Sequence, residues 1–388
     1  MISINSRIAQ VSGSTTLAIT ARANELKAQG VDVVSFAAGE PDFDTPEYIK
    51  DAAIKAIHAG FTKYTPSSGT EELRLAICDK LKKDNKLEYK PGQIVVGSGA
   101  KHVIFNAVMV LCDAGDEVII PAPYWVSYPE MVKVAGALPR YIQTTPASKF
   151  KITADQLESA ITPKTKLLIL NSPSNPTGSV YSRKELEAIA VICVKHQVCV
   201  ISDEIYEKLL YTDNEFVSIA ALGKDIYDLT ITVNGMSKAY AMTGWRIGYA
   251  AGPAAVMGHM KNLQDHSTSN PSSISQKAAL AALRVSDNSI KSMRDEFLLR
   301  RDLMMSLVDT ISGVSYVKPD GAFYLFCDFS KYGSCAEVAK RILNDVNVAV
   351  IPGDGFGAEG YLRFTFCTSQ ERIREGVARI KGWISKST

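Results

Sequence analysis

The chain has 388 residues, of which 46% are hydrophobic and 22% are charged, and its formal net charge is +2. This size and hydrophobic content allow one large core with a smaller appended domain, whereas the nearly balanced charge argues against a nucleic-acid-binding surface. No apolar run reaches the length needed to span a membrane, and residues 1–10 lack the pattern of a signal peptide.

Strand-like and helix-like patterns alternate from about residue 47 to about residue 283. Such alternation is typical of a parallel sheet with crossover helices, so we predict an α/β fold. We assign residues 47–285 to a large cofactor-binding domain with a mostly parallel sheet flanked by helices. The two terminal segments, residues 1–46 and 286–388, are predicted to form a smaller α+β domain.

The first candidate site follows the apolar run at residues 94–96. There Gly97-Ser98-Gly99-Ala100-Lys101 leads into apolar residues at helical spacing, namely Val103, Ile104, Ala107, Val108 and Leu111. Small residues at a helix start let backbone N–H groups approach an anion, and the helix dipole favours its charge. The pattern is a weak signal alone, because glycine-rich turns between strands and helices are common.

Two further apolar runs, residues 167–170 and 198–201, lead into polar loops that contain Asn175 and the pair Asp203 and Tyr206. Both runs are typical of buried strands. In open α/β sheets, ligands bind outside the carboxyl ends of parallel strands. These polar residues are therefore expected to meet at one edge of the sheet.

A fourth apolar run, residues 229–233, is followed by Ser237-Lys238 and then by Arg246. An amine condenses with an aldehyde only in its neutral form, and burial together with a nearby cation lowers a lysine's pKa. Arg246 supplies such a cation and a planar fork suited to a phosphate. The arrangement is the one expected of a lysine that holds pyridoxal phosphate, although a lysine in an ordinary loop stays an alternative.

Under this hypothesis Asp203 faces the pyridine nitrogen of the cofactor and keeps it protonated, which makes the ring an electron sink. Asn175 and Tyr206 would hydrogen-bond the phenolic oxygen of the ring. Each residue also has a purely structural explanation: Asp203 could be a helix N-cap, Asn175 a turn residue and Tyr206 a core tyrosine. Their joint occurrence at strand ends favours the cofactor site.

Near the C-terminus, residues 289–311 have apolar side chains at roughly helical spacing and predict an amphipathic helix. We expect its charged residues to form a solvated face; they include Arg294, Asp295, Glu296, Arg300, Arg301 and Asp302. Residues 361–366 alternate as a strand that sends Arg363 to the face opposite Leu362 and Phe364. Arg363 could grip a carboxylate bidentately, although the pattern alone favours a solvated strand arginine.

The chain as a whole resembles the class I aspartate aminotransferases of bacterial subgroup Ib, which are fold type I pyridoxal phosphate enzymes. The resemblance covers nearly the full length and rests on segments that follow one another in order. They are Gly39-Glu-Pro-Asp-Phe-Asp-Thr-Pro46, Lys63-Tyr64, Ser98-Gly-Ala-Lys101, Pro123-Tyr-Trp125, Asn171-Ser-Pro-Ser-Asn-Pro-Thr-Gly178, Ser202-Asp-Glu-Ile-Tyr206, Ser237-Lys238, Thr243-Gly-Trp-Arg-Ile-Gly-Tyr249 and Tyr361-Leu-Arg-Phe364.

The resemblance implies pyridoxal 5'-phosphate as cofactor and a ping-pong exchange of an amino group between L-aspartate and 2-oxoglutarate. It implies that Lys238 forms the Schiff base and shuttles the proton, that Asp203 pairs with the ring nitrogen and that Trp125 stacks on the ring. The residues implied to hold the phosphate are Gly99, Ala100, Ser237 and Arg246, with Lys101 beside them. Tyr64 is implied to reach the partner subunit's site, so a homodimer with shared active sites is expected.

For the substrate, the resemblance implies contacts from Gly39, Trp125 and Asn175, with Arg363 on the α-carboxylate. The side-chain pocket would contain Ser14, Thr16 and Lys101, whose ammonium would meet the distal carboxylate of aspartate or glutamate. Some subgroup members with this threonine and lysine also transaminate prephenate, so that activity and a broader acceptance of aromatic substrates stay open. Gly13 stands where relatives often have proline, and Ala100 stands where they often have a second glycine.

Seven cysteines and five histidines are scattered through the chain without a Cys-x-x-Cys pair. We therefore expect reduced thiols in a cytoplasmic protein and no metal site. The expected partners are small amino acids and 2-oxo acids, with neither nucleic acid nor membrane. Two rival functions are a pyridoxal phosphate-dependent lyase or decarboxylase, and a ligand-sensing regulator, which usually carries an additional DNA-binding segment.

Overall fold

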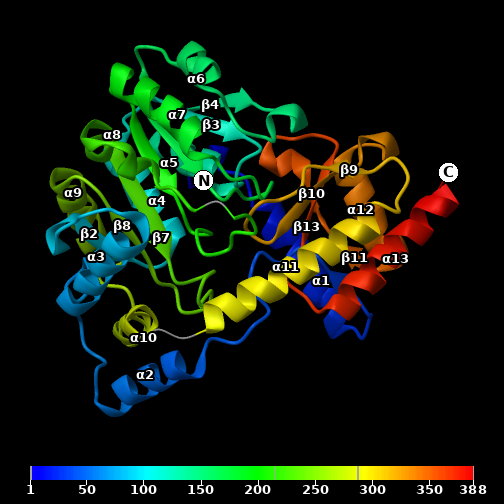
Figure 1. The fold of residues 1–388 in the computed structure, drawn as a ribbon, viewed down its shortest axis with the longest axis horizontal. Helices are drawn as coiled ribbons and strands as arrows, with labels where there is room; N and C mark the ends of the chain where they lie inside the picture. The colour runs from blue at the N-terminus through cyan, green and yellow to red at the C-terminus, as the bar shows by residue number, and fades with distance from the viewer. Residues whose placement is uncertain (1, 214, 286–287, 388) are drawn as a thin grey trace.

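The computed structural model describes residues 2–213, 215–285 and 288–387 (Figure 1). Its main sheet has the strand order β2-β8-β7-β6-β5-β3-β4, in which β8 is antiparallel to both neighbours and the other pairs are parallel. The strands are β2 (Ile94–Gly97), β3 (Glu117–Ala122), β4 (Leu138–Gln143), β5 (Thr165–Asn171), β6 (Cys199–Asp203), β7 (Thr230–Gly235) and β8 (Gly248–Ala251). The predicted mostly parallel α/β sheet is confirmed.

Helices cover both faces of this sheet, which explains why its inner strands are buried along most of their length (Figure 1). The helices of this part are α3 (Glu71–Asn85), α4 (Ala100–Leu111), α5 (Ser127–Ala135), α6 (Ala154–Ala160), α7 (Arg183–His196), α8 (Lys224–Leu229), α9 (Ala254–Asp265) and α10 (Ser273–Arg284), together with α2 (Glu47–His58), which packs on α10. Local signals set several helix ends; for example, Ser182 and Glu185 form a capping box at the start of α7.

A second, antiparallel sheet has the order β12-β13-β10-β9 and packs with helices near the C-terminus (Figure 1). Its elements are β9 (Ser315–Tyr316), β10 (Tyr324–Asp328), β12 (Ile351–Pro352), β13 (Tyr361–Thr365), α11 (Ser289–Val308), α12 (Cys335–Val346) and α13 (Gln370–Ser387). The remaining short helices are η1 (Ile8–Gln10), η2 (Pro91–Gln93), η3 (Pro146–Ser148), η4 (Ile219–Leu222), η5 (Ser330–Tyr332) and η6 (Gly353–Phe356).

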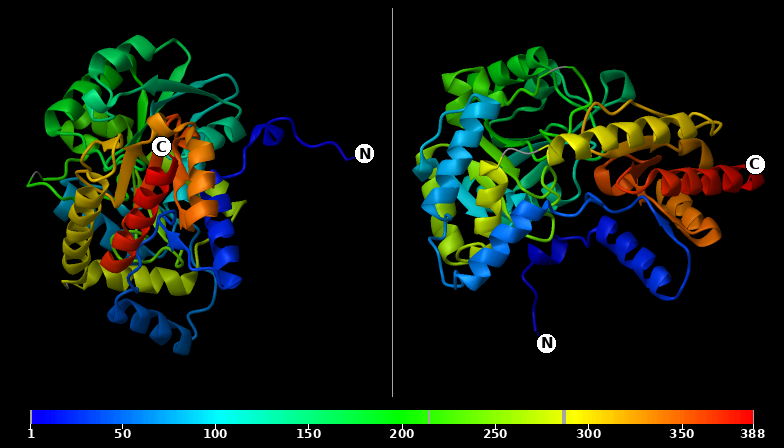
Figure 2. Two further views of the ribbon diagram at one scale, coloured as in Figure 1. Left: turned by 90° about the vertical axis from the view of Figure 1, so that its right-hand side faces the viewer. Right: turned by 60° about the horizontal axis from the view of Figure 1, so that its bottom comes forward.

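The N-terminal segment joins this second sheet's side of the molecule. After α1 (Thr15–Ala28), strand β1 (Val34–Ser35) pairs in parallel with β11 (Val348–Ala349). The residues before η1 extend away from the body (Figure 2), whereas the N–H of Ser12 donates to Glu130 Oε2 in α5 at 2.8 Å. The predicted domain limits stay predictions, and the one between residues 285 and 286 adjoins residues 286–287, which lie outside the described part.

One expectation about α11 is wrong. The helix forms as predicted, but Arg300 and Arg301 are only 7% and 3% exposed instead of lying on a solvated face. Arg300 Nη1 donates to Asp42 Oδ1 at 2.7 Å, and Arg301 Nη1 donates to the carbonyl of Pro319 at 3.1 Å. A guanidinium can be buried when such acceptors are present, and they come from segments that a helical pattern does not reveal.

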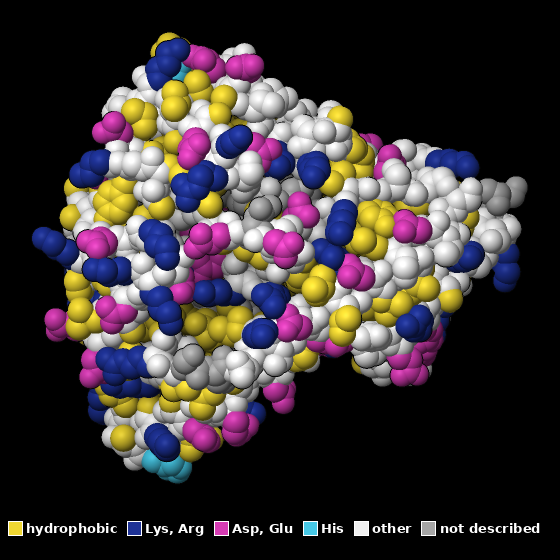
Figure 3. All heavy atoms as spheres, in the orientation of Figure 1, with side chains coloured by type: hydrophobic (Ala, Val, Ile, Leu, Met, Phe, Trp, Pro, Cys, Tyr) yellow, Lys and Arg dark blue, Asp and Glu magenta, His cyan; other side chains and the backbone are white. Residues whose placement is uncertain are grey.

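Positive and negative side chains are interspersed on the face of the molecule drawn in Figure 3. Across the described ranges, no helix combines the length and the apolar character needed to cross a membrane.

Candidate active site

A cavity of about 400 Å³ opens where the carboxyl ends of β5, β6 and β7 meet α1 and β13. The structure brings most of the predicted site residues together around it. Those in its wall are Thr16, Gly39, Ala100, Lys101, Trp125, Asn175, Asp203, Tyr206, Ser237, Lys238, Arg246 and Arg363.

Lys238 lies in the loop after β7, and its Nζ donates a hydrogen bond to the carbonyl of Gly39 at 2.6 Å. Removal from water lowers the pKa of Lys238 to about 8; the charge of Arg246 acts in the same direction, and that of Glu40 opposes it. A fraction of the lysine is therefore a neutral amine near neutral pH, which is the form that reacts with an aldehyde.

Asp203 ends β6 and is 4% exposed. Its Oδ2 accepts a hydrogen bond from the hydroxyl of Tyr128 at 2.6 Å, and its Oδ1 accepts one from the N–H of Ile205 at 3.3 Å. Burial raises the pKa of Asp203 to about 6, while the bond from Tyr128 acts against that rise. The carboxyl group is thus mostly ionised at neutral pH, and both hydrogen bonds favour its charged form.

Tyr128 is a site residue that the sequence analysis missed. It is fully buried in α5, lines the cavity and packs edge-on against Trp125 with ring centroids 5.3 Å apart. No pattern in the sequence marks it, because its role depends on its hydroxyl meeting Asp203 at the end of β6.

Arg363 is 2% exposed on β13, so the alternative of a solvated strand arginine is wrong. Its Nη1 donates to Asn175 Oδ1 at 2.9 Å and its Nη2 donates to the carbonyl of Ala37 at 2.8 Å. Its Nε has no hydrogen-bond partner among the described residues. A buried guanidinium that holds only neutral acceptors is suited to receive an anionic ligand.

Tyr324 on β10 supports this arginine and was also missed. Its ring lies 4.5 Å from the Arg363 guanidinium, and its hydroxyl is hydrogen-bonded to that of Tyr206 at 2.8 Å. A Cβ at position 39 would lie 2.6 Å from the Tyr324 hydroxyl oxygen, which explains the glycine there. These contacts join the N-terminal segment, β10 and the loop after β6 around one wall of the cavity.

The start of α4 and Arg246 form a cradle with the donor groups that a phosphate needs. Arg246 donates from Nη2 to the carbonyl of Ser98 at 3.2 Å, and Ser237 lines the cavity next to it. Gly99 does not line the cavity itself, but a Cβ there would meet Arg246 Nη2 at 2.4 Å. Arg246 itself has a φ of 56°, a strained conformation that is typical of functional sites.

The proposed side-chain pocket is only partly assembled. Lys101 Nζ lies 4.8 Å from the centroid of the Trp125 ring, and Thr16 in α1 lines the same cavity. Burial lowers the pKa of Lys101, and the charge of Arg246 adds to the effect. Ser14 instead caps α1, where its hydroxyl accepts from the N–H of Leu17 at 3.3 Å, so its contact with substrate stays a prediction.

Tyr64 lies between α2 and α3 and is 91% exposed, outside the wall of this cavity. Its predicted contact with a partner subunit stays a prediction. Across the described ranges, no group of three or more His, Cys, Asp or Glu side chains is arranged to hold a metal ion.

Residues 31–380 match the family model described as "Aminotransferase class I and II". The chain belongs to this family. The aspartate aminotransferase of Bacillus sp. (strain YM-2) is 51% identical over 97% of this chain and 98% of the relative. The aspartate/prephenate aminotransferase of Nitrosomonas europaea is 46% identical, over 98% and 100% of the two chains.

Solved structures agree with the class I and II aminotransferase fold. The structure of the aspartate aminotransferase from Thermus thermophilus with maleate has a TM-score of 0.94 and 42% identity, covering 98% of this chain and 100% of the other. The predicted fold class and the predicted resemblance to aspartate aminotransferases are both confirmed. The family also implies use of pyridoxal phosphate.

Proposed function

We propose that the protein is a pyridoxal phosphate-dependent aminotransferase that exchanges an amino group between L-aspartate and 2-oxoglutarate, giving oxaloacetate and L-glutamate. The observation that carries this proposal is that one cavity contains Lys238 and Asp203 together with Arg363 and Lys101, two cations besides the phosphate-cradle residue Arg246. A dicarboxylic amino acid has two carboxylates for which these cations are suitable partners.

The residues of the cavity fit pyridoxal phosphate on chemical grounds. The bare backbone at Gly99 lets the guanidinium of Arg246 lie beside the start of α4, so that a phosphate would meet a helix N-terminus and an arginine fork. Asp203 offers a carboxylate for the ring nitrogen, and Lys238 offers an amine for the aldehyde. When bound, the cofactor supplies an electron sink for a carbanion at the substrate's α-carbon.

The remaining work belongs to the side chains. Arg363 binds the α-carboxylate and fixes the direction of the α C–H bond, while Lys101 binds the distal carboxylate. The amine of Lys238 would take the proton from the α-carbon as general base and then, as general acid, donate it to the carbon on the other side of the amino nitrogen. Trp125 covers one side of the cavity and limits access of water.

Absorbance of the purified protein loaded with pyridoxal phosphate tests this function. Stoichiometric L-aspartate or L-glutamate should abolish the visible band of the bound cofactor, with oxaloacetate or 2-oxoglutarate released in equal amount, whereas L-alanine should react much more slowly. Persistence of the band with every donor would reject the aminotransferase. Alanine formed from aspartate would indicate a decarboxylase, release of ammonia without transfer to a 2-oxo acid would indicate a lyase, and ligand-dependent DNA binding without turnover would revive the regulator.

Prephenate is a second candidate acceptor, because Thr16 and Lys101 line the same cavity and relatives are named aspartate/prephenate aminotransferases.

Replacing Lys101 by methionine should raise KM for aspartate about 10- to 100-fold, since it removes one charge-assisted bond worth roughly 1.5–3 kcal/mol. The measurement is kcat/KM for aspartate and for alanine. Lys261→Met on α9 is the control. If the ratio of kcat/KM for aspartate to kcat/KM for alanine is the same in Lys101→Met as in wild type, Lys101 does not bind the distal carboxylate.

Tyr128→Phe should raise the pKa of Asp203 above about 6, because the hydroxyl that favours the carboxylate is lost. A larger fraction of the Asp203 carboxyl groups is then protonated at pH 7 in the folded protein. We expect kcat/KM to fall about tenfold, with the acid limb of its pH profile moved to higher pH. Tyr124→Phe, which removes a hydroxyl outside this cavity, is the control; superimposable profiles for Tyr128→Phe and wild type would refute the tuning role.

The homodimer and the cytoplasmic location are part of the same proposal. Sedimentation should give twice the chain mass. Mixed dimers of a Tyr64→Phe chain and a Lys238→Ala chain should contain one fully wild-type site only if Tyr64 serves the cofactor bound by the partner's Lys238.

A further inference from the structure

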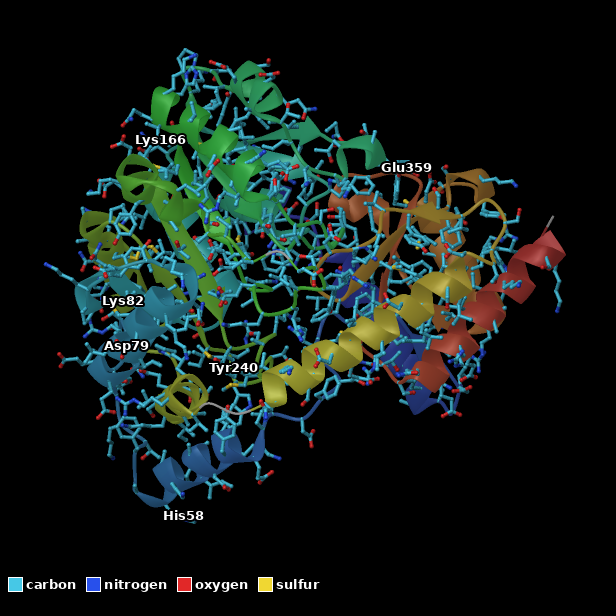
Figure 4. All side chains as sticks on the ribbon, viewed as in Figure 1. His58, Asp79, Lys82, Lys166, Tyr240 and Glu359 are labelled. Atoms are coloured by element: carbon cyan, nitrogen blue, oxygen red, sulfur yellow. The ribbon has the colours of Figure 1, made fainter. Side chains whose placement is uncertain are left out.

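A buried polar cluster lies behind β6, on the side away from the cavity. Because neighbouring strand residues point to opposite faces, Asp203 faces Tyr128 and the cavity while Ser202 and Glu204 face α3. We call this group the Glu204 cluster; it consists of Lys80, Asp84, Asn85, Glu204, Glu207 and Lys208. Asp79 and Lys82, labelled in Figure 4, are exposed positions of the same helix α3.

Glu204 is 1% exposed, and its hydrogen-bond partners among the described residues are all neutral. Its Oε1 accepts from the hydroxyls of Ser202 at 2.9 Å and Ser218 at 2.6 Å, and its Oε2 accepts from Asn85 Nδ2 at 3.2 Å. Serine hydroxyls can accept as well as donate, so the same geometry serves a protonated carboxyl group. An ionised carboxylate buried without a contacting cation is strongly disfavoured.

The other charges of the cluster balance without Glu204. Lys80 pairs with Glu207, and Lys208 pairs with Asp84 at 2.7 Å. Lys80 Nζ also lies 3.9 Å from Asp84, so the two cations and two anions form one group. An ionised Glu204 would add a fifth, unbalanced charge to the interior.

The ionisation behaviour of Glu204 agrees with this count. Burial raises its pKa to about 8 and the charge of Glu207 adds to the rise, while the bonds from Ser218 and Ser202 and the charge of Lys80 oppose it. Two tyrosines also face the cluster, Tyr89 from the segment after α3 and Tyr249 from β8, and burial raises the pKa of each, so both stay neutral.

Glu204 also fixes the backbone on both sides of Asp203. Its bond to Ser202 links the two residues that flank Asp203, and its own N–H donates to the carbonyl of Val233 at 2.9 Å. The carbonyl of Asp203 accepts from Asn171 Nδ2 at 3.0 Å. The Asp203 side chain between them bonds to Tyr128 and lines the cavity.

We propose that Glu204 is held as a neutral carboxylic acid and acts as a positioning residue for Asp203. The role given to Asp203 rests on the proposed function; the neutrality of Glu204 does not. Its sequence neighbour Asp203 is thereby the one carboxylate of the pair that presents its charge to the cofactor site.

The thermal unfolding midpoint of the cofactor-loaded protein between pH 5 and pH 9 tests the neutrality. The folded pKa of Glu204, about 8, exceeds its ordinary value of 4.5, so the folded state binds more protons between these values and wild-type stability falls as pH rises through them. Glu204→Gln cannot ionise and lacks this fall. The unfolding midpoint of Glu204→Gln, relative to that of wild type, should therefore increase as pH rises. Glu207→Gln is the matched control, and its midpoint should lie below that of wild type because it loses the ion pair with Lys80.

A deficit of Glu204→Gln that grows with pH would show an ionised, paired Glu204 and overturn the proposal. Cofactor affinity tests the positioning: by equilibrium dialysis at pH 7, Glu204→Gln should bind pyridoxal phosphate within about twofold of wild type and Glu204→Ala about tenfold more weakly. Wild-type cofactor affinity in folded Glu204→Ala would also overturn the positioning role. If that variant does not fold, affinity of Glu204→Gln more than about twofold below wild type would overturn it instead. Failure of wild type to bind the cofactor would instead refute the proposed function.

Discussion

Replacing Lys238 by alanine is expected to lower kcat by at least ~10⁴-fold, the upper end of what a general acid–base group contributes. Lys238 is the lysine whose Nζ lies in the cavity next to Gly39 with a pKa lowered to about 8, and alanine leaves no group there to move the proton. Single-turnover and steady-state rates with aspartate and 2-oxoglutarate measure the loss.

Cofactor binding separates this chemical loss from misfolding. The phosphate cradle at Gly99, Ser237 and Arg246 is untouched, so the Lys238→Ala protein should still bind pyridoxal phosphate noncovalently, as dialysis can show. Lys195→Ala, which changes an exposed lysine of α7, should keep wild-type kcat. Turnover within tenfold of wild type in Lys238→Ala would remove this lysine from the mechanism.

Arg363→Ala should lower kcat/KM for aspartate by ~10²–10⁴-fold, because each charge-assisted hydrogen bond of a bidentate grip contributes ~1.5–3 kcal/mol. The loss should fall mainly on KM, since the α-carboxylate is held throughout the reaction. Arg363→Lys restores the charge without the planar fork and should recover only part of the affinity. Kinetics with aspartate and glutamate over a wide concentration range provide both constants.

Stability must be measured alongside, because Arg363 is buried and bonds to Asn175 and Ala37. Arg183→Ala on the surface of α7 is the control for arginine loss. A folded Arg363→Ala protein with unchanged KM for both dicarboxylic substrates would disprove its assignment to the α-carboxylate.

The strand ends that carry the cofactor residues could be predicted from the sequence, because each was a short apolar run with a polar residue at its end. The sheet then brings Asn175, Asp203 and Lys238 to one edge as parallel topology requires. The helix after Gly99 was predictable for the same reason, since its apolar spacing and its small first residues agree.

Tyr128 and Tyr324 could not be predicted in this way. Each is a buried aromatic residue whose role depends on one hydroxyl meeting a group from another element, at Asp203 and Tyr206. The burial of Arg300 was missed for a similar reason, because its acceptor Asp42 lies 258 positions away in the chain. Periodicity reports which face of an element is apolar, whereas these contacts depend on tertiary pairing.

The pairing of β1 with β11 has a consequence for how the site comes into being. Its walls combine Thr16 and Gly39 from the beginning of the chain with Arg363 from near its end, and the short parallel ladder joins these two regions. A nascent chain whose large-sheet residues have emerged from the ribosome therefore contains Lys238 but still lacks Arg363, the residue assigned to the α-carboxylate. Catalytic competence should appear only when the last strands have been synthesised, so C-terminally shortened chains should hold cofactor without turning over substrate.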